Sequence, residues 1–501
     1  MVYFEVSFKQ KHIKMRKLLF FLLVPILFGC QQISCQKVVK KPKAQPPNII
    51  IIFTDDQGYQ DLGCFGSPDI KTPHLDKMAQ EGIKLTSFYS AQAVCSASRA
   101  ALLTGCYPNR LGIHGALFPN SKKGLNPAET TIAEMLQRIG YKTGIFGKWH
   151  LGDHADFLPN NHGFDEYLGI PYSNDMWPVD YAGNQVDSTH RKIRFPQLPL
   201  IKNKEKIREI RTLEDQGQLT TQLTEGAIDF IQRNKDHPFF LYFPHPMPHV
   251  PLAVSQKFKG KSKQGLYGDV IMEIDWSVGQ IRKALKDNKL EENTLVIFTS
   301  DNGPWLNFGN HAGSAHPLRE GKGTALEGGQ REPCIIYYPD KIKAGRTIDV
   351  PMMTIDILPT LAEVTGAKLP NNKIDGKSIW DIWTGDADQS PQEAYYFYYH
   401  KNELHGVRYN NWKMYFPHRY RTLNGRTGGK DGFPVNYDYN TFDQIELYDL
   451  SKDISETANV AAENPEVVAE IESLANKMRL ELGDHLYDQP GKENRPVGSV
   501  E

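Results

Sequence analysis

The chain has 501 residues, 40% of them hydrophobic, so it can bury a large core. Its 58 basic and 59 acidic residues leave a formal net charge of −1, which excludes a strongly basic protein built to bind a polyanion. We therefore expect no nucleic-acid partner. Length alone would suggest about three domains, but large α/β enzymes often combine one big domain with one small domain.

Residues 1–30 have the pattern of an export signal. A basic segment precedes an apolar run, Leu18 to Phe28, that is too short to span a bilayer as a helix. The run ends in "LFGC", which resembles the lipobox of bacterial lipoproteins, in which the cysteine, here Cys30, is lipidated after cleavage. An ordinary signal peptide cut nearby is the alternative. We predict export to the periplasm or cell envelope, with a lipid anchor on Cys30 as the one membrane contact.

Residues 31–47 form a Lys/Pro-rich tether with no apolar periodicity. We expect the folded part to begin at Asn48, with a catalytic domain over 48–380 and a smaller domain over 381–501. The change of composition near Trp380 sets this boundary, because the short aromatic segments "EAYYFYYH", "GVRYNNWKMYF" and "QIELYDL" follow it. These segments predict a small α+β domain, which a helix starting at Asn464-Pro465 completes.

Polar side chains follow several apolar runs before that boundary. "NIIIIFTDD" ends in Asp55 and Asp56, and "TLVIFTSDNG" contains Asp301 and Asn302. Continuous β-branched runs are typical of strands buried on both faces of a parallel sheet. The carboxyl ends of such strands are where open α/β sheets bind ligands. "YKTGIFGKWHLG" and "PFFLYFPHPMPHVPL" repeat the arrangement with Lys148 and with a pair of histidines.

Helical patterns alternate with these runs. A helix is predicted from Thr72-Pro73 to Gly82, and others over residues 131–139, 224–235 and 267–290. Strands and helices that alternate with short connections predict an α/β fold with a large, mostly parallel sheet flanked by helices.

The segment "VCSASRAALLTG" places Cys95 directly before a short apolar helix. A thiolate nucleophile, as in tyrosine phosphatases, is one explanation. That chemistry needs five residues between cysteine and arginine, whereas only three separate Cys95 from Arg99. A purely structural turn is another alternative, but it leaves the adjacent arginine unexplained. The other cysteines of the folded part suit small buried apolar sites: Cys64, Cys106 and Cys334.

"CSASRAALLTG" resembles the signature of the type I sulfatases, within the alkaline phosphatase superfamily. "GKWHLG", "GIPYSND", "SDNG" and "GKGTALEGGQREP" follow in the order that this family uses. In the family, a maturase oxidises the signature cysteine to formylglycine, whose hydrate attacks the sulfur of a sulfate ester. The resemblance therefore implies a sulfatase, a formylglycine made from Cys95, and a formylglycine-generating maturase as partner. Ala97 stands where the commoner signature has proline.

The acidic strand ends also predict a cation site. Three carboxylates and an amide oxygen suit Ca²⁺ or Mg²⁺ better than zinc. A solvated turn is the alternative for the Asp55–Asp56 pair. The resemblance favours one Ca²⁺ per chain and adds the modified cysteine to its ligands, which are then Asp55, Asp56, Cys95, Asp301 and Asn302.

The resemblance also implies roles for the other motif residues. Arg99 orients the formylglycine, and His150 accepts the proton from the sulfated diol. His249 contacts the bridging ester oxygen and acts as the general acid, with His245 as the alternative. Three further residues hold the sulfate oxygens: Lys148, Ser173 and Lys322.

The most plausible substrate for an exported enzyme of this kind is a sulfated polysaccharide or its oligosaccharides. Two alternatives are a phosphoester hydrolase of the same superfamily and a catalytically inactive glycan-binding lipoprotein. The first would need a Ser or Thr nucleophile and extra histidine ligands, and the second would have lost catalytic positions. Candidate sugar contacts are Asn310, His311, His316, His400, His405, Arg408, Trp177 and Trp305.

Overall fold

The largest element of the computed structural model, which describes residues 46–501, is an 11-stranded sheet. Its order is β11-β2-β10-β9-β1-β8-β4-β5-β6-β7, and β12 pairs with β2. The central strands β9, β1, β8, β4 and β5 are parallel, whereas β10, β6 and β7 pair antiparallel with their neighbours. The strands are β1 (Asn48–Thr54), β2 (Ile83–Tyr89), β4 (Lys142–Lys148), β5 (Glu166–Ile170), β6 (Leu198–Lys202), β7 (Glu205–Ile210), β8 (Phe239–Pro244), β9 (Thr294–Ser300), β10 (Arg331–Tyr337), β11 (Arg346–Ile348) and β12 (Met352–Met353).

Strand β1 shows why the sheet is buried on both faces. Its side chains alternate between two hydrophobic clusters, with Ile49, Ile51 and Phe53 in one and Ile50 and Ile52 in the other. Period-two alternation in an uninterrupted apolar run lets a strand serve both faces at once. The predicted α/β class with a mostly parallel sheet is confirmed.

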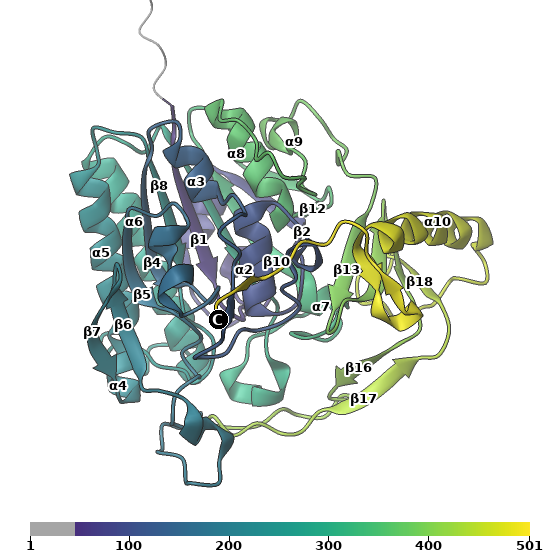
Figure 1. The fold of residues 1–501 in the computed structure, drawn as a ribbon, viewed down its shortest axis with the longest axis horizontal. Helices are drawn as coiled ribbons and strands as arrows, with labels where there is room; N and C mark the ends of the chain where they lie inside the picture. The colour runs from purple at the N-terminus through teal and green to yellow at the C-terminus, as the bar shows by residue number, and fades with distance from the viewer. Residues whose placement is uncertain (1–45) are drawn as a thin grey trace, which may run out of the picture. The chain divides into compact units, whose positions relative to one another are not determined.

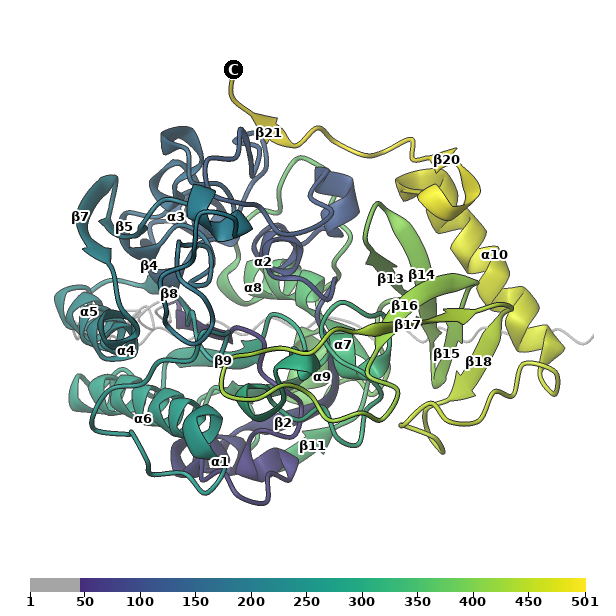
Figure 2. The same cartoon turned by 90° about the horizontal axis from the view of Figure 1, so that it is seen from below.

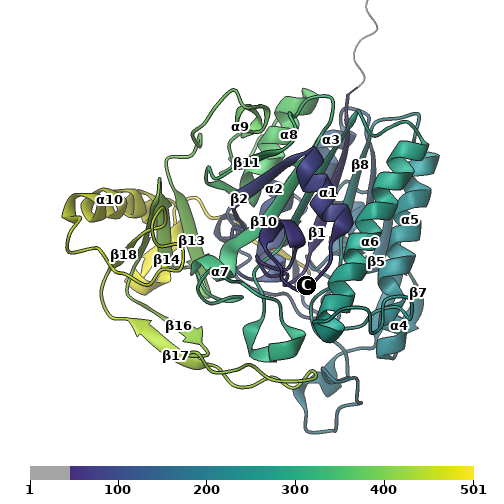
Figure 3. The ribbon, with the colours of Figure 1, turned by 180° about the vertical axis from the view of Figure 1, so that it is seen from behind.

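Helices cover both faces (Figures 2 and 3). One face carries α2, α3, α8 and α9, whose apolar side chains join the cluster that holds Ile49. The other face carries α1, α5 and α6, with Ile50 in their cluster. Their bounds are α1 (Pro73–Glu81), α2 (Cys95–Thr104), α3 (Ile132–Gln137), α4 (Leu213–Gly217), α5 (Leu219–Arg233), α6 (Gly265–Asp287), α7 (Glu327–Gln330), α8 (Ile357–Thr365) and α9 (Trp380–Thr384).

A second, antiparallel sheet of four strands lies in the C-terminal part, in the order β13-β14-β15-β18. Helix α10 (Pro465–Leu482) packs on it (Figure 1), with Ile471 and Leu474 in the same cluster as Val407 and Met414. The strands of this part are β13 (Tyr395–Tyr399), β14 (Glu403–Tyr409), β15 (Trp412–Tyr415), β16 (His418–Thr422), β17 (Asp438–Phe442), β18 (Glu446–Asp449), β19 (Gly483–Asp484) and β20 (Gln489–Pro490).

The segments before and after residue 380 pack against each other. Helix α9 begins at the expected boundary, residue 380, and its Trp383 is buried in the core beside α8. The last strand, β21 (Gly498–Ser499), pairs with β3 (Lys123–Gly124) of the preceding part. The expected signal peptide and tether lie outside the described residues, apart from the last two tether positions. Among residues 46–501, no helix combines the length and apolar character needed to cross a membrane.

A buried ionic cluster joins the two sheets. Glu327, on α7, accepts hydrogen bonds of 2.7 Å from Lys413 of β15 and from the Tyr89 hydroxyl of β2. Arg331 adds an ion pair of 3.1 Å to the same carboxylate. Because an unpaired buried charge is costly, this cluster fixes the C-terminal sheet against α7 and β2.

Candidate active site

Two neighbouring parallel strands bring four polar residues together. Thr54 of β1 lies opposite Ser300 of β9, so the residues that follow the two strands are also side by side. The Asp56 amide donates a 3.1 Å hydrogen bond to Asp301 Oδ1, and the Asn302 amide group donates one of 2.7 Å to Asp56 Oδ1. Asp55 and Asp301 are both fully buried. The structure thus brings the polar residues that follow these two strands together.

Helix α2 supplies Cys95 and Arg99 to the same place. The Cys95 thiol lies 3.4 Å from Asp55 Oδ1 and 3.3 Å from Lys322 Nζ. Arg99, one turn further along the helix, contacts Asp55 at 3.0 Å and Asp301 at 2.8 Å. Its Nη1 donates to the Lys148 carbonyl at the end of β4.

The charges in this cluster balance. Three carboxylates, of Asp55, Asp56 and Asp301, face three cations: Arg99, Lys148 and Lys322. Burial alone would raise the pKa of Asp55, but the Lys148 and Arg99 charges hold it well below its usual range. Burial alone would lower the pKa of Lys322, but the Asp56 charge, with Cys95 and Asp55, holds it well above its usual range. The ions are therefore retained by mutual pairing, as buried charges must be.

The donor set fits a hard cation. Asp56 Oδ2 and Asn302 Oδ1 are buried and accept no hydrogen bond from any residue that the structure describes. Ligand atoms of Asp55, Asp56, Cys95 and His249 all lie within 4.8 Å of one another. Buried oxygens without a donor are costly unless something positive binds them. The expected oxygen ligands are thus close together, although both Asp301 oxygens accept hydrogen bonds in this arrangement.

The unmodified Cys95 thiol is poorly suited to attack. It is 2% exposed, and burial together with the Asp55 charge raises its pKa well above the usual range. The thiolate is the reactive form of cysteine, so a raised pKa disfavours thiolate chemistry. The burial and raised pKa of Cys95 therefore disfavour the interpretation of this segment as a phosphatase-like thiolate site.

A pocket of about 180 Å³ opens over Cys95. Four other motif residues reach it: His150, Ser173, His249 and Lys322. Lys148 lies behind Ser173 and donates to its hydroxyl at 3.1 Å. The remaining lining residues are Ala93, Val94, Ala116, Phe118, Asp175, Met176, Arg191, Trp305, Tyr399 and Arg421.

His150 is set up to accept a proton. Its Nε2 donates to the Leu117 carbonyl at 2.9 Å, and its Nδ1 is buried without a partner. Burial, with the nearby Lys148 and Arg99 charges, lowers the pKa of His150 well below its usual range. The ring is therefore neutral, with an unshared pair on Nδ1. His150 and Asp56 both have φ of 60°, a backbone strain that clusters at functional sites.

The geometry separates the two candidate histidines after β8. His249 donates from Nδ1 to the Val250 carbonyl, and its Nε2 lies 3.5 Å from Asp56 Oδ2 in the pocket wall. His245 is fully buried against Phe243, with ring centroids 4.3 Å apart, and does not line the pocket. His249 is thus the histidine that a bound ester would meet.

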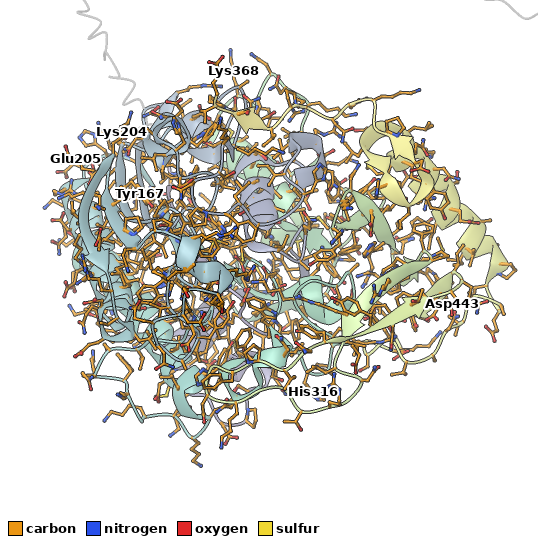
Figure 4. The ribbon with its side chains drawn as sticks, turned by 60° about the horizontal axis from the view of Figure 1, so that its bottom comes forward. Tyr167, Lys204, Glu205, His316, Lys368 and Asp443 are labelled. Atoms are coloured by element: carbon orange, nitrogen blue, oxygen red, sulfur yellow. The ribbon has the colours of Figure 1, made fainter. Side chains whose placement is uncertain are left out.

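Most of the expected sugar contacts lie elsewhere. Trp305 lines the pocket, with its ring 5.6 Å from that of His249. Trp177 is fully buried and His405 stacks on His418 at 3.8 Å, so neither is free to contact a sugar. His316 lies on the outer surface (Figure 4). The others also lie outside the pocket lining: Asn310, His311, His400 and Arg408.

Sequence reasoning missed the outer wall of the pocket. Phe118, Asp175, Arg191, Tyr399 and Arg421 come from loops, a short 3-10 helix and the C-terminal strands. None belongs to a run with helical or strand periodicity that points to a site. Asp175 stands within the quoted "GIPYSND" motif and was the one member that the motif itself could have indicated.

Comparison with known proteins identifies the family. The family model described as Sulfatase matches residues 47–367, and the model described as the C-terminal region of aryl-sulfatase matches residues 390–496. The chain belongs to the sulfatase family. Its fold, with the large mixed sheet and the smaller antiparallel sheet, and its activity as a sulfuric ester hydrolase follow from that membership.

Individual sulfatases are similar over most of their length. Arylsulfatase A of Homo sapiens is 38% identical over 453 residues, which cover 86% of this chain and 87% of the relative. N-acetylgalactosamine-6-sulfatase of Canis lupus familiaris is 37% identical, over 74% of this chain and 72% of the relative. The crystal structure of the PsFucS1 sulfatase from Pseudoalteromonas sp. superposes with a TM-score of 0.79 at 27% identity, covering 91% and 92% of the two chains.

Proposed function

We propose that this sulfatase removes sulfate from sulfated polysaccharide or its oligosaccharides, through a formylglycine made from Cys95 and one bound Ca²⁺. The observation that carries the proposal is the position of Cys95. Its side chain lies at the start of α2, between Asp55 and Lys322, at the floor of the pocket. No other described cysteine lines that pocket.

The modification and the cation complement this position. The formylglycine hydrate supplies one hydroxyl that attacks sulfur and a second that expels sulfate when the aldehyde re-forms. Asp55, Asp56, Asp301, Asn302 and the modified Cys95 would hold the Ca²⁺, which would polarise the ester and favour the ionised hydroxyl. The buried oxygens without hydrogen-bond donors support this ligand set. A divalent cation adds two positive charges to a cluster whose charges otherwise balance. A bound sulfate monoester carries one negative charge and cancels one of them.

The protein's own side chains bind the sulfate, position the carboxylates and transfer the protons. Lys148 and Ser173, bonded to each other at 3.1 Å, and Lys322 hold the sulfate oxygens and stabilise their growing negative charge. Arg99 fixes the carboxylates on which the site is built. His249 in its doubly protonated form donates the Nε2 proton to the bridging oxygen of the leaving alcohol, because Nδ1 is bonded to the Val250 carbonyl. His150 Nδ1 accepts a proton in the elimination step.

The glycan assignment rests on the relative that is named for N-acetylgalactosamine 6-sulfate and on the pocket's lining. Trp305 offers an aromatic face beside His249, as sugar-binding sites commonly do. Export to the periplasm or cell envelope, with a lipid anchor on Cys30, belongs to the same proposal, because polymeric glycans are met outside the cell. A maturase that accepts Ala97 is its necessary partner.

Sulfate release from a panel of defined sulfated oligosaccharides tests the function. The protein is produced with a competent maturase, and mass spectrometry first measures how much Cys95 is converted. We expect sulfate release from at least one oligosaccharide, at a rate proportional to the converted fraction. Release of phosphate from phosphoesters with no release of sulfate would contradict the proposal. Glycan binding without any turnover by fully converted protein would contradict it too.

A further inference from the structure

Arg191 is a charged side chain of the pocket wall that has no hydrogen-bond or ion-pair partner among the described residues. It begins the short 3-10 helix η5 (Arg191–Arg194), lines the pocket and is exposed. Within residues 46–501 its guanidinium makes no hydrogen bond and no ion pair. An arginine offers five N–H donors in a planar fork that matches carboxylate and sulfate oxygens.

The other lining cations already have partners. Lys322 is held by Asp56 at 2.5 Å and by the Cys95 sulfur at 3.3 Å. Arg421 donates from Nε to the Lys322 carbonyl at 2.8 Å. Of the lining arginine and lysine side chains, Arg191 is therefore the one whose charged group has no hydrogen-bond partner among residues 46–501.

The single lining carboxylate of the described residues, Asp175, is also engaged. The Tyr181 hydroxyl donates to it at 3.2 Å. Lys192, whose Nζ lies 3.7 Å from the centre of the Tyr181 ring, adds a second cation behind Arg191. The wall on this side is thus net positive.

We propose that Arg191 binds a second anionic group on the substrate, a carboxylate or a second sulfate, beside the sulfate ester that is cleaved. The inference rests on the proposed function and narrows it to glycans with more than one negative charge. The proposed function places the cleaved sulfate at Lys148, Ser173 and Lys322, so an anionic group at Arg191 would belong to a different part of the same sugar chain.

Paired oligosaccharides test this assignment. One pair of sulfated disaccharides differs in a uronate carboxylate or its methyl ester, and another differs in a second sulfate or a free hydroxyl. The reference substrate is 4-nitrophenyl sulfate, which carries a single sulfate. We expect the wild type to prefer the doubly charged member of at least one pair, and Arg191→Gln to lower kcat/KM for it about tenfold, mainly through KM. The disaccharide pair whose preference is lost in Arg191→Gln shows whether Arg191 binds a carboxylate or a sulfate.

Controls separate charge recognition from a structural effect. Arg194, exposed on the same 3-10 helix and outside the pocket lining, is the matched control, and Arg194→Gln should leave every kcat/KM unchanged. Arg191→Lys should recover part of the preference, and 4-nitrophenyl sulfate should change less than about twofold with either Arg191 variant.

Two results would overturn the inference while leaving the proposed function intact. In one, the wild type hydrolyses 4-nitrophenyl sulfate yet accepts no doubly charged disaccharide better than its singly charged partner. In the other, Arg191→Gln lowers kcat/KM equally for 4-nitrophenyl sulfate and the disaccharides. Absence of sulfate release from every compound, with Cys95 fully converted, would instead overturn the proposed function itself.

Discussion

Arg421 Nε donates a hydrogen bond of 2.8 Å to the backbone carbonyl of Lys322. Arg421 belongs to β16, in the C-terminal part, whereas Lys322 contacts Cys95 at the pocket floor. Gly323 permits the approach, because its φ is 80° and a Cβ there would lie 2.4 Å from the guanidinium carbon. The C-terminal part therefore positions a residue that is expected to bind sulfate.

Arg421→Ala should lower kcat/KM for an aryl sulfate about 10- to 100-fold, because the loop that carries Lys322 loses a charge-assisted hydrogen bond. Arg419→Ala is the matched control, since Arg419 lies on the same strand, is exposed and packs on Tyr439. The Arg421→Ala/Lys322→Ala double variant should lose little more than Lys322→Ala alone. Fully additive losses would mean that Arg421 acts independently of Lys322.

The site residues at the strand ends could be predicted from the sequence, whereas the residues of the pocket wall could not. Asp55, Asp56 and Asp301 follow apolar β-branched runs, and parallel strands align their carboxyl ends at one edge of a sheet. Arg191 and Arg421 carry no such local signal, because only tertiary packing brings an exposed 3-10 helix and a hairpin strand to Cys95.

Backbone register and side-chain burial decide two further features that could not be predicted from the sequence. His245 and His249 share one proline-rich segment, and only the folded backbone shows which ring faces Asp56. An aromatic residue near a motif fits core packing as well as sugar stacking, and Trp177 proved to be core. The chemical roles of the motif residues stay predictions, which the following experiments address.

Asp275, on α6, should make stability depend on pH. Its carboxylate accepts hydrogen bonds from the Leu75 and His74 amides at the start of α1, at 2.8 and 3.2 Å. Burial raises its pKa from 3.8 to about 7. A carboxyl with a higher pKa in the folded state binds more protons there, so the free energy of unfolding falls as pH rises from about 4 to about 7.

Asp275→Asn should remove that dependence, about 2–4 kcal/mol across the interval. Urea unfolding at several pH values, followed by circular dichroism, measures the slope. Glu225→Gln, an exposed carboxyl on the neighbouring helix α5, serves as the control and should retain the wild-type slope. An unchanged slope in Asp275→Asn would show that Asp275 is not the group responsible.

Asp301→Ala should abolish activity, by at least about 100-fold, through loss of a calcium ligand. The chain should stay folded, because Arg99 keeps its 3.0 Å ion pair with Asp55 and the preceding strand β9 is wholly buried. Elemental analysis measures calcium per chain. Asp175→Asn, which changes a pocket carboxylate outside the ligand set, should retain calcium. Wild-type calcium content and activity in Asp301→Ala would refute the metal assignment.

His249→Ala should slow esters with poor leaving groups about 10²- to 10⁴-fold and activated aryl sulfates much less, because a good leaving group needs little protonation. A series of aryl sulfates with leaving groups of graded acidity measures the difference as a slope. His245→Ala changes a buried ring outside the pocket lining and should keep the wild-type slope. Equal losses across the series in His249→Ala would indicate binding without acid catalysis.

Cys95 as encoded should be inactive. Its thiol is buried and has a raised pKa, and it offers no second hydroxyl with which to expel sulfate. Protein from a host without a maturase that accepts Ala97 should fold but release no sulfate, and co-expression with a competent maturase should restore turnover in proportion to conversion. Cys95→Ala should be inactive in both hosts.

Because Cys95 is 2% exposed, adding the maturase to folded protein should convert little of it. Mass spectrometry of the peptide from Val94 to Arg99, beside sulfate release, decides the matter, and rapid turnover by wholly unmodified protein would revive the thiolate mechanism.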